Sequence, residues 1–252
     1  MNHMYKIVIL DLDGTLLNSD KMIPEYTNEI IKKLSNEVKF VLASARAFVT
    51  IKPYVEQLGL LNQNNFTIAF NGSLVVNNIE EPIIDETIEM NEKVALQQYI
   101  NNHTQVEWHY YTYDKNILSS DIPDINNFIQ NNKIYKIVCI ADEVVITEMR
   151  KKIPQYIESL FQITSSEPTR IEFVKKGMKK IEAIKLLLKK LNIDSSEAIA
   201  MGDGENDIDM IQYAGCGVAM GNATDEVKNI ANMVTDTNDN NGVGKALLKI
   251  IK

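Results

Sequence analysis

Two short acidic motifs carry the residue types in this chain that could do chemistry. The first is Asp-Leu-Asp-Gly-Thr at residues 11–15, directly after the apolar run at 7–10. Two acids two residues apart at a strand end can divide the work, one as nucleophile and cation ligand, the other as general acid and base. The second motif is Gly-Asp-Gly-Glu-Asn-Asp at residues 202–207, after the apolar run at 198–201. Its three acids, amide and two glycines predict an oxygen-rich loop suited to a hard cation such as Mg²⁺.

Two weaker signals involve a hydroxyl and a lysine. Ser44-Ala45-Arg46 follows the apolar run at 41–43, so a hydroxyl and a backbone N–H lie at a strand-to-helix junction. Such a junction can hold a phosphate oxygen, although a serine there is more often a helix N-cap. Lys180 begins a predicted helix, where a cation opposes the helix dipole unless an anion lies nearby. The neighbouring lysines leave that assignment open: Lys175, Lys176 and Lys179.

The outer thirds of the chain must supply the elements that position these motifs. Short apolar runs alternate there with amphipathic stretches, which predicts a Rossmann-like parallel sheet with helices on both faces. Ligands of such sheets bind beyond the carboxyl ends of the strands, where both acidic motifs would emerge. Pro53 predicts a kink or a restart in the helix after Arg46. The sequence predicts strands at 5–10, 39–43, 67–70, 198–201, 217–220 and 233–235, and helices at 24–35, 181–191 and 243–251.

The middle third has a different rhythm and predicts a separate α+β domain inserted into the outer fold. We expect a core of residues 1–80 and 180–252 and an inserted cap of residues 81–179. Along its first strand, Trp108 and Tyr110 alternate with His109, Tyr111 and Tyr113, so two aromatic faces are predicted. Both faces are more simply explained as core or surface than as substrate contacts. The predicted cap strands are 106–113, 133–141 and 169–174, with helices at 92–102, 122–131 and 143–160.

The order of these motifs resembles the haloacid dehalogenase-like hydrolases. More narrowly, the chain is similar to the Cof-type phosphatases, which carry a large α/β cap between their second and third motifs. The resemblance continues through Cys-Gly-Val-Ala-Met-Gly-Asn-Ala at 216–223, Asp-Glu-Val-Lys at 225–228 and Asn-Gly-Val at 241–243. It implies a Mg²⁺-dependent hydrolase of small phosphomonoesters, such as sugar phosphates, acting through an aspartyl-phosphate.

The resemblance also implies roles for individual residues. Asp11 would be the nucleophile and Asp13 the general acid and base. Asp11, the Asp13 carbonyl and Asp203 would hold Mg²⁺, with Asp207 supporting the metal or orienting Lys180. The phosphate-binding residues would be Ser44, Ala45, Arg46, Lys180 and Asn206.

Two positions depart from the family pattern. The family commonly has Thr-Gly-Arg where this chain has Ser44-Ala45-Arg46, which keeps the hydroxyl but allows a less close approach of the backbone. It commonly has Ser-Lys-Gly where this chain has Lys-Lys-Ile at 179–181.

Composition narrows the classes of partner. The 252 residues are 45% hydrophobic and carry a net charge of −8, which predicts a folded protein without attraction to nucleic acid or anionic membranes. The chain has only two cysteines, and no apolar run approaches a signal peptide or a membrane span, so we expect a cytoplasmic protein. Its partner would be a small phosphorylated metabolite. The sequence does not fix the oligomeric state, and a monomer is compatible with it.

Two other functions fit the same motifs. A phosphohexomutase uses aspartyl-phosphate chemistry but returns the phosphoryl group to a sugar instead of to water. A non-catalytic module that binds a phosphorylated ligand could retain the fold, although the complete set of acids and Lys180 argues against it. Product analysis with a hexose 1-phosphate distinguishes a mutase from a phosphatase. A panel of phosphomonoesters distinguishes a non-catalytic module from an enzyme.

Overall fold

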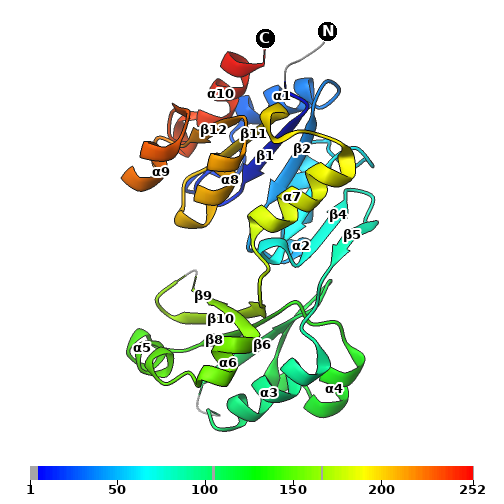
Figure 1. Cartoon of the computed structure of the whole chain (residues 1–252), viewed down its shortest axis with the longest axis vertical. Coiled ribbons are helices and arrows are strands. Elements are labelled where there is room, and N and C mark those ends of the chain that lie inside the picture. The colour runs from blue at the N-terminus through cyan, green and yellow to red at the C-terminus, as the bar shows by residue number, and fades with distance from the viewer. Residues whose placement is uncertain (1–4, 104–105, 166, 252) are drawn as a thin grey trace. The chain divides into compact units, whose positions relative to one another are not determined.

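The computed structural model describes residues 5–103, 106–165 and 167–251 (Figure 1). These residues divide into two compact units. The first unit, the core, contains residues 5–46, 50–84 and 179–251. The second unit, the cap, contains the described residues among 47–49 and 85–178. The core is thus assembled from segments on both sides of the cap in sequence.

The core is built on one sheet whose central strand carries the first acidic motif. β1 is buried along its whole length, and its partners β2 and β11 both run parallel to it. The sheet is parallel from β13 to β3, β4 is antiparallel to β3, and β5 is the last strand beyond β4. The predicted α/β fold class, with a parallel-strand core, is therefore confirmed. The strand order is β13 (Met233–Val234), β12 (Cys216–Ala219), β11 (Ala198–Gly202), β1 (Ile7–Asp11), β2 (Lys39–Ala43), β3 (Phe66–Ala69), β4 (Leu74–Asn77) and β5 (Pro82–Asp85).

Helices follow the parallel strands and cover the sheet. α1 packs on α10, and α7 packs on α8. α7 buries one side of its surface, including Ile181, Ile184 and Leu188, as its apolar spacing predicts. The helices of the core are α1 (Glu25–Leu34), α2 (Phe48–Gln57), α7 (Lys180–Leu191), α8 (Ile208–Tyr213), α9 (Asp225–Ile230) and α10 (Gly242–Ile250). Single 3₁₀ turns are η1 (Phe70–Gly72), η3 (Ser195–Glu197), η4 (Glu205–Asp207) and η5 (Asn238–Asn240).

Two predictions of helix continuity are wrong: the restart at Pro53 is absent, and the single helix at 143–160 is interrupted. α2 runs through Pro53 as one helix, with no restart. A proline removes only its own N–H bond, and Val49, whose carbonyl loses that partner, is 42% exposed and can be solvated. Conversely, the helix expected at 143–160 is two helices, α5 (Glu143–Lys151) and α6 (Gln155–Leu160), because Pro154 takes the N-cap position of α6.

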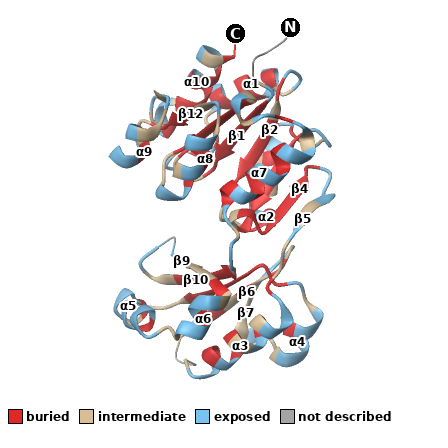
Figure 2. Ribbon diagram, in the orientation of Figure 1, coloured by how far each residue is buried: buried red, intermediate tan, exposed pale blue. Residues whose placement is uncertain are grey.

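The cap folds around an antiparallel sheet with its helices on one face (Figures 1 and 2). Strands β7 and β9, at the two edges, and β4 and β5 of the core were not predicted, because their apolar runs are short and bordered by turns. The cap sheet order is β7 (Asn116–Leu118), β6 (Glu107–Tyr111), β8 (Lys136–Ile140), β10 (Arg170–Lys175) and β9 (Phe161–Thr164). Besides α5 and α6, the cap has α3 (Met90–Asn101), α4 (Ile125–Asn131) and the turn η2 (Ser119–Asp121).

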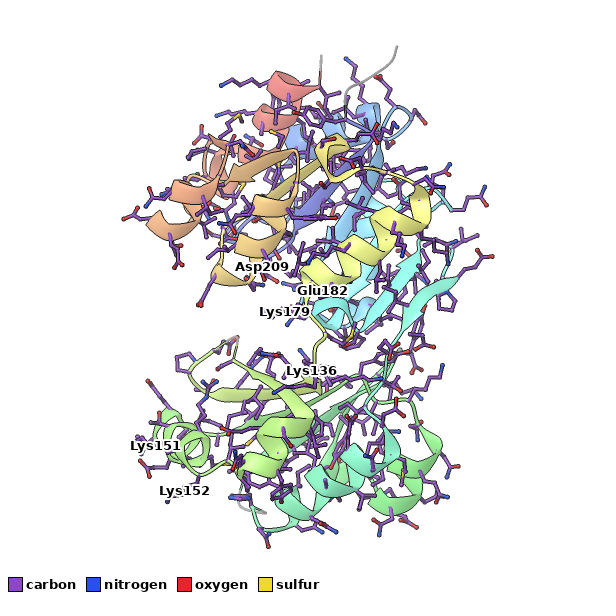
Figure 3. The ribbon with its side chains drawn as sticks, viewed as in Figure 1. Lys136, Lys151, Lys152, Lys179, Glu182 and Asp209 are labelled. Carbon is purple, nitrogen blue, oxygen red and sulfur yellow. The ribbon has the colours of Figure 1, made fainter. Side chains whose placement is uncertain are left out.

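The two faces of β6 separate as the alternation predicts. Trp108 and Tyr110 are 1% and 0% exposed and belong to the apolar core of the cap. The opposite face of the cap sheet is polar, with the Lys136 and Glu172 side chains paired at 3.1 Å and Lys136 (labelled in Figure 3) 5.0 Å from the centre of the Tyr111 ring. The alternating aromatic residues of β6 therefore contribute to an apolar core on only one face of the cap sheet.

The possibility of a membrane-spanning helix can also be tested on the structure. Within the residues that the structure describes, no helix combines the length and the apolar character needed to cross a bilayer.

Candidate active site

The ends of β1 and β11 bring the two acidic motifs together. In the parallel pairing of these strands Leu10 lies opposite Met201, so Asp11 and Gly202 come level at the same edge of the sheet. Asp203 follows β11 directly, and Asp207 ends the turn η4 beyond it. Asp11, Asp203 and Asp207 each offer a carboxylate oxygen, and these oxygens lie within 4.8 Å of one another. Segments 190 residues apart in sequence therefore form one carboxylate cluster.

Lys180 is the cation in this cluster. Its Nζ donates to Asp11 Oδ1 at 2.5 Å and to Asp207 Oδ1 at 2.9 Å, and its side chain is 2% exposed. Lys180 is also the first residue of α7, where the helix dipole disfavours a cation. Two carboxylates at hydrogen-bond distance outweigh that unfavourable field.

The other three candidate lysines have different partners. Lys175 pairs with Glu86 and Glu89, and Lys176 donates to the Glu158 carbonyl. Lys179 faces the exposed Asp209 at 3.7 Å, and both are labelled in Figure 3. Of the four lysines, Lys180 is the one placed among the cluster carboxylates, and its role toward a phosphate stays a prediction.

Burial and charge shift the acid–base properties of the cluster. Burial, the largest cause, together with the charges of Asp207 and Asp203 raises the pKa of Asp11 to about 8, and the nearby Lys180 offsets this increase only in part. Burial disfavours the charged form of Lys180 and by itself would lower the pKa. The carboxylates of Asp11 and Asp207 have the larger effect and raise the pKa of Lys180. Burial also raises the pKa of Asp203. The cluster has an excess of buried negative charge that a divalent cation would neutralise.

Gly14 and Thr15 allow the first acidic motif to contact the second at Asp203. Gly14 has φ +83°, and a Cβ on it would lie 2.2 Å from Asp203 Oδ2, so only glycine allows this approach. The Thr15 hydroxyl donates to Asp203 Oδ1 at 2.9 Å. Asp207 closes its own loop, because its Oδ2 accepts the N–H groups of Asp203 and Gly204 at 3.1 Å each. The contacts of Asp207 thus orient Lys180 and the loop that carries Asp203.

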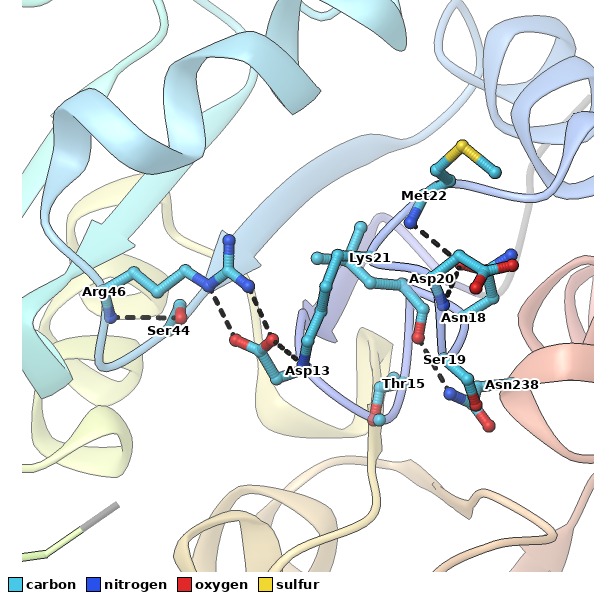
Figure 4. A network of polar contacts seen from close by, with 12 residues as sticks. Asp13, Thr15, Asn18, Ser19, Asp20, Lys21, Met22, Ser44, Arg46 and Asn238 are labelled. Atoms are coloured by element: carbon cyan, nitrogen blue, oxygen red, sulfur yellow. Dashed lines mark hydrogen bonds and ion pairs between the residues drawn. The ribbon is translucent and has the colours of Figure 1, made fainter. Parts of the chain in front are cut away.

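Asp13 points into a different environment, held by two cations (Figure 4). Arg46 donates from Nε to Oδ2 at 2.7 Å and from Nη2 to Oδ1 at 2.6 Å, and Lys21 Nζ donates to Oδ1 at 2.9 Å. Burial would raise the pKa of Asp13, but the hydrogen bonds and charges of Arg46 and Lys21 outweigh it and lower that pKa. Asp13 is therefore a carboxylate in this state, separate from the Lys180 cluster.

The remaining predicted phosphate ligands border the site to different degrees. Ser44 is buried at the end of β2, and its Oγ accepts the Arg46 N–H at 3.1 Å. Ala45 is half-buried between them, and Asn206 is exposed on η4. The Arg46 guanidinium already donates hydrogen bonds to Asp13. To bind a phosphate as predicted, it would have to form further hydrogen bonds to the phosphate oxygens. Roles of these residues toward a phosphate stay predictions.

The donor set is suited to a hard divalent cation. Asp11, Asp203 and Asp207 offer oxygen only, and Mg²⁺ prefers carboxylate oxygen over nitrogen or sulfur.

Sequence reasoning missed Lys21 as a partner of Asp13 and gave no role to Thr15 or Asn222. Thr15 lies inside the first motif and Asn222 inside the run at 216–223 that carries the resemblance, so both could have been considered, whereas no local pattern connects Lys21 to the site.

The fold and the site define a class of hydrolase with a carboxylate cluster at the edge of a parallel sheet. A family model described as haloacid dehalogenase-like hydrolase matches residues 8–247, so the chain belongs to that family of enzymes. A putative phosphatase of Haemophilus influenzae is 32% identical over 260 residues, covering 97% of each chain.

Two further relatives extend this likeness. A 5-amino-6-(5-phospho-D-ribitylamino)uracil phosphatase of Bacillus subtilis is 31% identical over 248 residues, covering 96% of this chain and 94% of the relative. Among solved structures, a haloacid dehalogenase-like hydrolase from Bacteroides thetaiotaomicron superimposes with a TM-score of 0.87 at 28% identity, covering 98% of this chain and 100% of that one. The resemblance drawn from the motifs is confirmed.

Proposed function

We propose that this enzyme is a Mg²⁺-dependent phosphatase that hydrolyses small phosphomonoesters through an aspartyl-phosphate on Asp11. The observation that carries the proposal is Lys180, buried at 2.5 Å from Asp11 and 2.9 Å from Asp207 beside Asp203. This arrangement fixes a carboxylate next to a cation and leaves negative charge for a metal to balance. The family and the phosphatase names of two relatives support the same reaction.

Asp11, Asp203 and the main-chain carbonyl of Asp13 would hold Mg²⁺, with Asp207 as support. When bound, the metal supplies positive charge that offsets repulsion between the Asp11 carboxylate and a phosphate dianion. Lys180 supplies a second positive charge from within the protein. The Ser44 hydroxyl and the Asn206 amide would donate hydrogen bonds to the phosphoryl oxygens, so that binding is mainly positioning and electrostatics.

The reaction would proceed in two displacements at phosphorus. An oxygen of Asp11 forms a bond to phosphorus while the bond to the leaving oxygen breaks, and Asp13 gives its proton to that oxygen. Asp13 then takes a proton from water, whose oxygen attacks phosphorus and breaks the bond to Asp11. Inorganic phosphate and an alcohol are released, and Asp11 is regenerated.

Asp13 needs a different protonation state in each step. The contacts with Arg46 and Lys21 favour the carboxylate that accepts the water proton. The first step needs the protonated form, so one of these contacts must be exchanged when substrate binds. Arg46 is the natural group to exchange, because its guanidinium can form paired hydrogen bonds with a phosphate as well as with a carboxylate.

A panel of phosphomonoesters assayed with and without Mg²⁺ tests the function. It should contain sugar phosphates, other small metabolite phosphates and the phosphoribitylamino-uracil named for the Bacillus relative. We expect release of inorganic phosphate only when Mg²⁺ is present. Isomerisation of a hexose 1-phosphate to the 6-phosphate would instead establish a phosphohexomutase. No turnover of any compound would leave a ligand-binding role.

Replacing Asp13 by asparagine should slow both chemical steps. We expect kcat for a sugar phosphate to fall about 10²- to 10⁴-fold, which is the usual contribution of a positioned general acid–base. With p-nitrophenyl phosphate, whose leaving group needs no proton, the first step should be nearly normal and the second slow.

Rapid mixing should therefore show a burst of p-nitrophenol equal to the enzyme concentration, followed by slow turnover. Asp20→Asn, the same change at an exposed position on the same loop, is the control. A variant that turns over both substrates at the wild-type rate would remove Asp13 from the mechanism.

A further inference from the structure

The segment from Asn222 to Asp239 ties down the loop that follows Asp13. The Asn222 Nδ2 donates to the Gly14 carbonyl at 2.8 Å, and the Asn238 Nδ2 donates to the Leu17 carbonyl at 2.9 Å. Figure 4 shows Asn238 against this loop. Asp239 accepts both the N–H and the hydroxyl of Ser19 at 2.8 Å each. Three contacts thus connect positions more than 200 residues apart in sequence.

Asn222 is also fixed at the other end of its amide. Its Oδ1 accepts the backbone N–H of Asn238 at 3.0 Å. An amide reversed by rotation would place its NH₂ against that N–H and its oxygen against the Gly14 carbonyl, so the two partners determine its orientation. The same segment reaches the second motif, because the Thr224 N–H contacts the Asp203 carbonyl at 3.4 Å.

Gly14 is the point where such an anchor matters most. It must lack a side chain because a Cβ would lie 2.2 Å from the Asp203 carboxylate. The absence of a Cβ makes this backbone the least restricted part of the loop. Gly14 also directly follows Asp13, whose carbonyl is a proposed ligand of Mg²⁺. A hydrogen bond to the Gly14 carbonyl therefore restricts the motion that the missing side chain permits.

We infer that Asn222 is a positioning residue that holds the Asp13 carbonyl in place for the divalent cation through its hydrogen bond to Gly14. The inference rests on the proposed function, since it assumes a cation at this site. Hydrogen-bond partners outside the ligand shell typically change metal affinity 10- to 100-fold when removed. Asn222 is exposed, so its loss should affect the cation more than the fold.

The test compares three alanine substitutions in the full-length protein. Asn222→Ala removes the anchor of Gly14. Asn238→Ala removes the Leu17 contact but keeps the backbone N–H that Asn222 accepts. Asn232→Ala is the matched control, because its Oδ1 accepts the Gly217 N–H at 2.7 Å, away from the loop. The Mg²⁺ dissociation constant is measured by calorimetry, together with the Tm without and with Mg²⁺.

We expect Asn222→Ala to raise the Mg²⁺ dissociation constant about tenfold and to reduce the Mg²⁺-induced rise in Tm. Asn238→Ala should lower the metal-free Tm more and the Mg²⁺ affinity less, and Asn232→Ala should leave the affinity unchanged. Equal affinity in Asn222→Ala and wild type, or an equal loss in Asn232→Ala, would overturn the inference. Wild-type protein that fails to bind Mg²⁺ would overturn the proposed function, and the inference with it.

Discussion

Replacing Asp11 by asparagine should lower kcat by about four orders of magnitude or more, as expected when the covalent nucleophile is removed. An amide cannot form the aspartyl-phosphate, and it also takes one carboxylate from the cation site. The measurement is release of inorganic phosphate at saturating Mg²⁺ with the best substrate of the panel. Asp209→Asn is the control, because Asp209 lies just beyond the same acidic motif with its side chain 54% exposed.

The fold of the Asp11→Asn variant should be intact. Its amide oxygen can still accept from Lys180, and one of the three acids that repel one another, Asp11, Asp203 and Asp207, is replaced by a neutral group. We therefore expect an unfolding free energy equal to that of the metal-free wild type or above it at neutral pH. A variant that keeps full activity would exclude Asp11 as the nucleophile. If the variant were both inactive and unfolded, its loss of activity would say nothing about the role of Asp11 in catalysis. The activity and the unfolding free energy are therefore measured together.

Replacing Lys180 by methionine should have the second largest effect, on both activity and stability. It removes the positive charge at 2.5 Å from Asp11, so we expect kcat to fall about 10³-fold, comparable with loss of an electrostatic group in other enzymes. It also leaves Asp11 and Asp207 buried without their cation, which should cost about 3–5 kcal/mol of unfolding free energy.

The stability loss should depend on pH in a definite direction. Without Lys180, burial and repulsion by Asp207 and Asp203 raise the pKa of Asp11 above the value of about 8 that it has beside the lysine. When folding raises the pKa of a carboxyl group, the protein loses stability as pH rises from the pKa of the unfolded state toward that of the folded state. Wild type loses stability in this way up to about pH 8, so the deficit of the variant should grow only above that pH and be larger near pH 9.5 than near pH 7.

Guanidinium unfolding of both proteins without metal at these two pH values measures the difference. Lys185→Met on the same helix is the control, because Lys185 is exposed and its ion pair with Glu182 is on the surface. A Lys180→Met protein as stable as wild type near pH 9.5 would contradict the buried pairing.

Local sequence determined the elements and the position of the chemistry. Each acidic motif directly follows an apolar run, and a run of that kind is stable only when buried in the sheet. Because parallel strands end at one edge, Asp11 and Asp203 had to lie at the same edge once both runs were strands, and the pairing of β1 with β11 then brought them together. The errors fell at prolines and at short strands: Pro53 proved compatible with a helix, and the apolar runs of β4, β5, β7 and β9 are too short to be found.

Only the tertiary structure decided which side chains complete the site. Four lysines within six residues had similar local patterns, and the packing of α7 against α8 selected Lys180. The contact of Asn222 with Gly14 depends on how segments 208 residues apart approach each other, and that of Lys21 with Asp13 depends on how the loop between them folds back. Hydrophobic pattern specifies which elements are buried, whereas the partner of a polar side chain depends on distances of a few tenths of an ångström that only the packed chain sets.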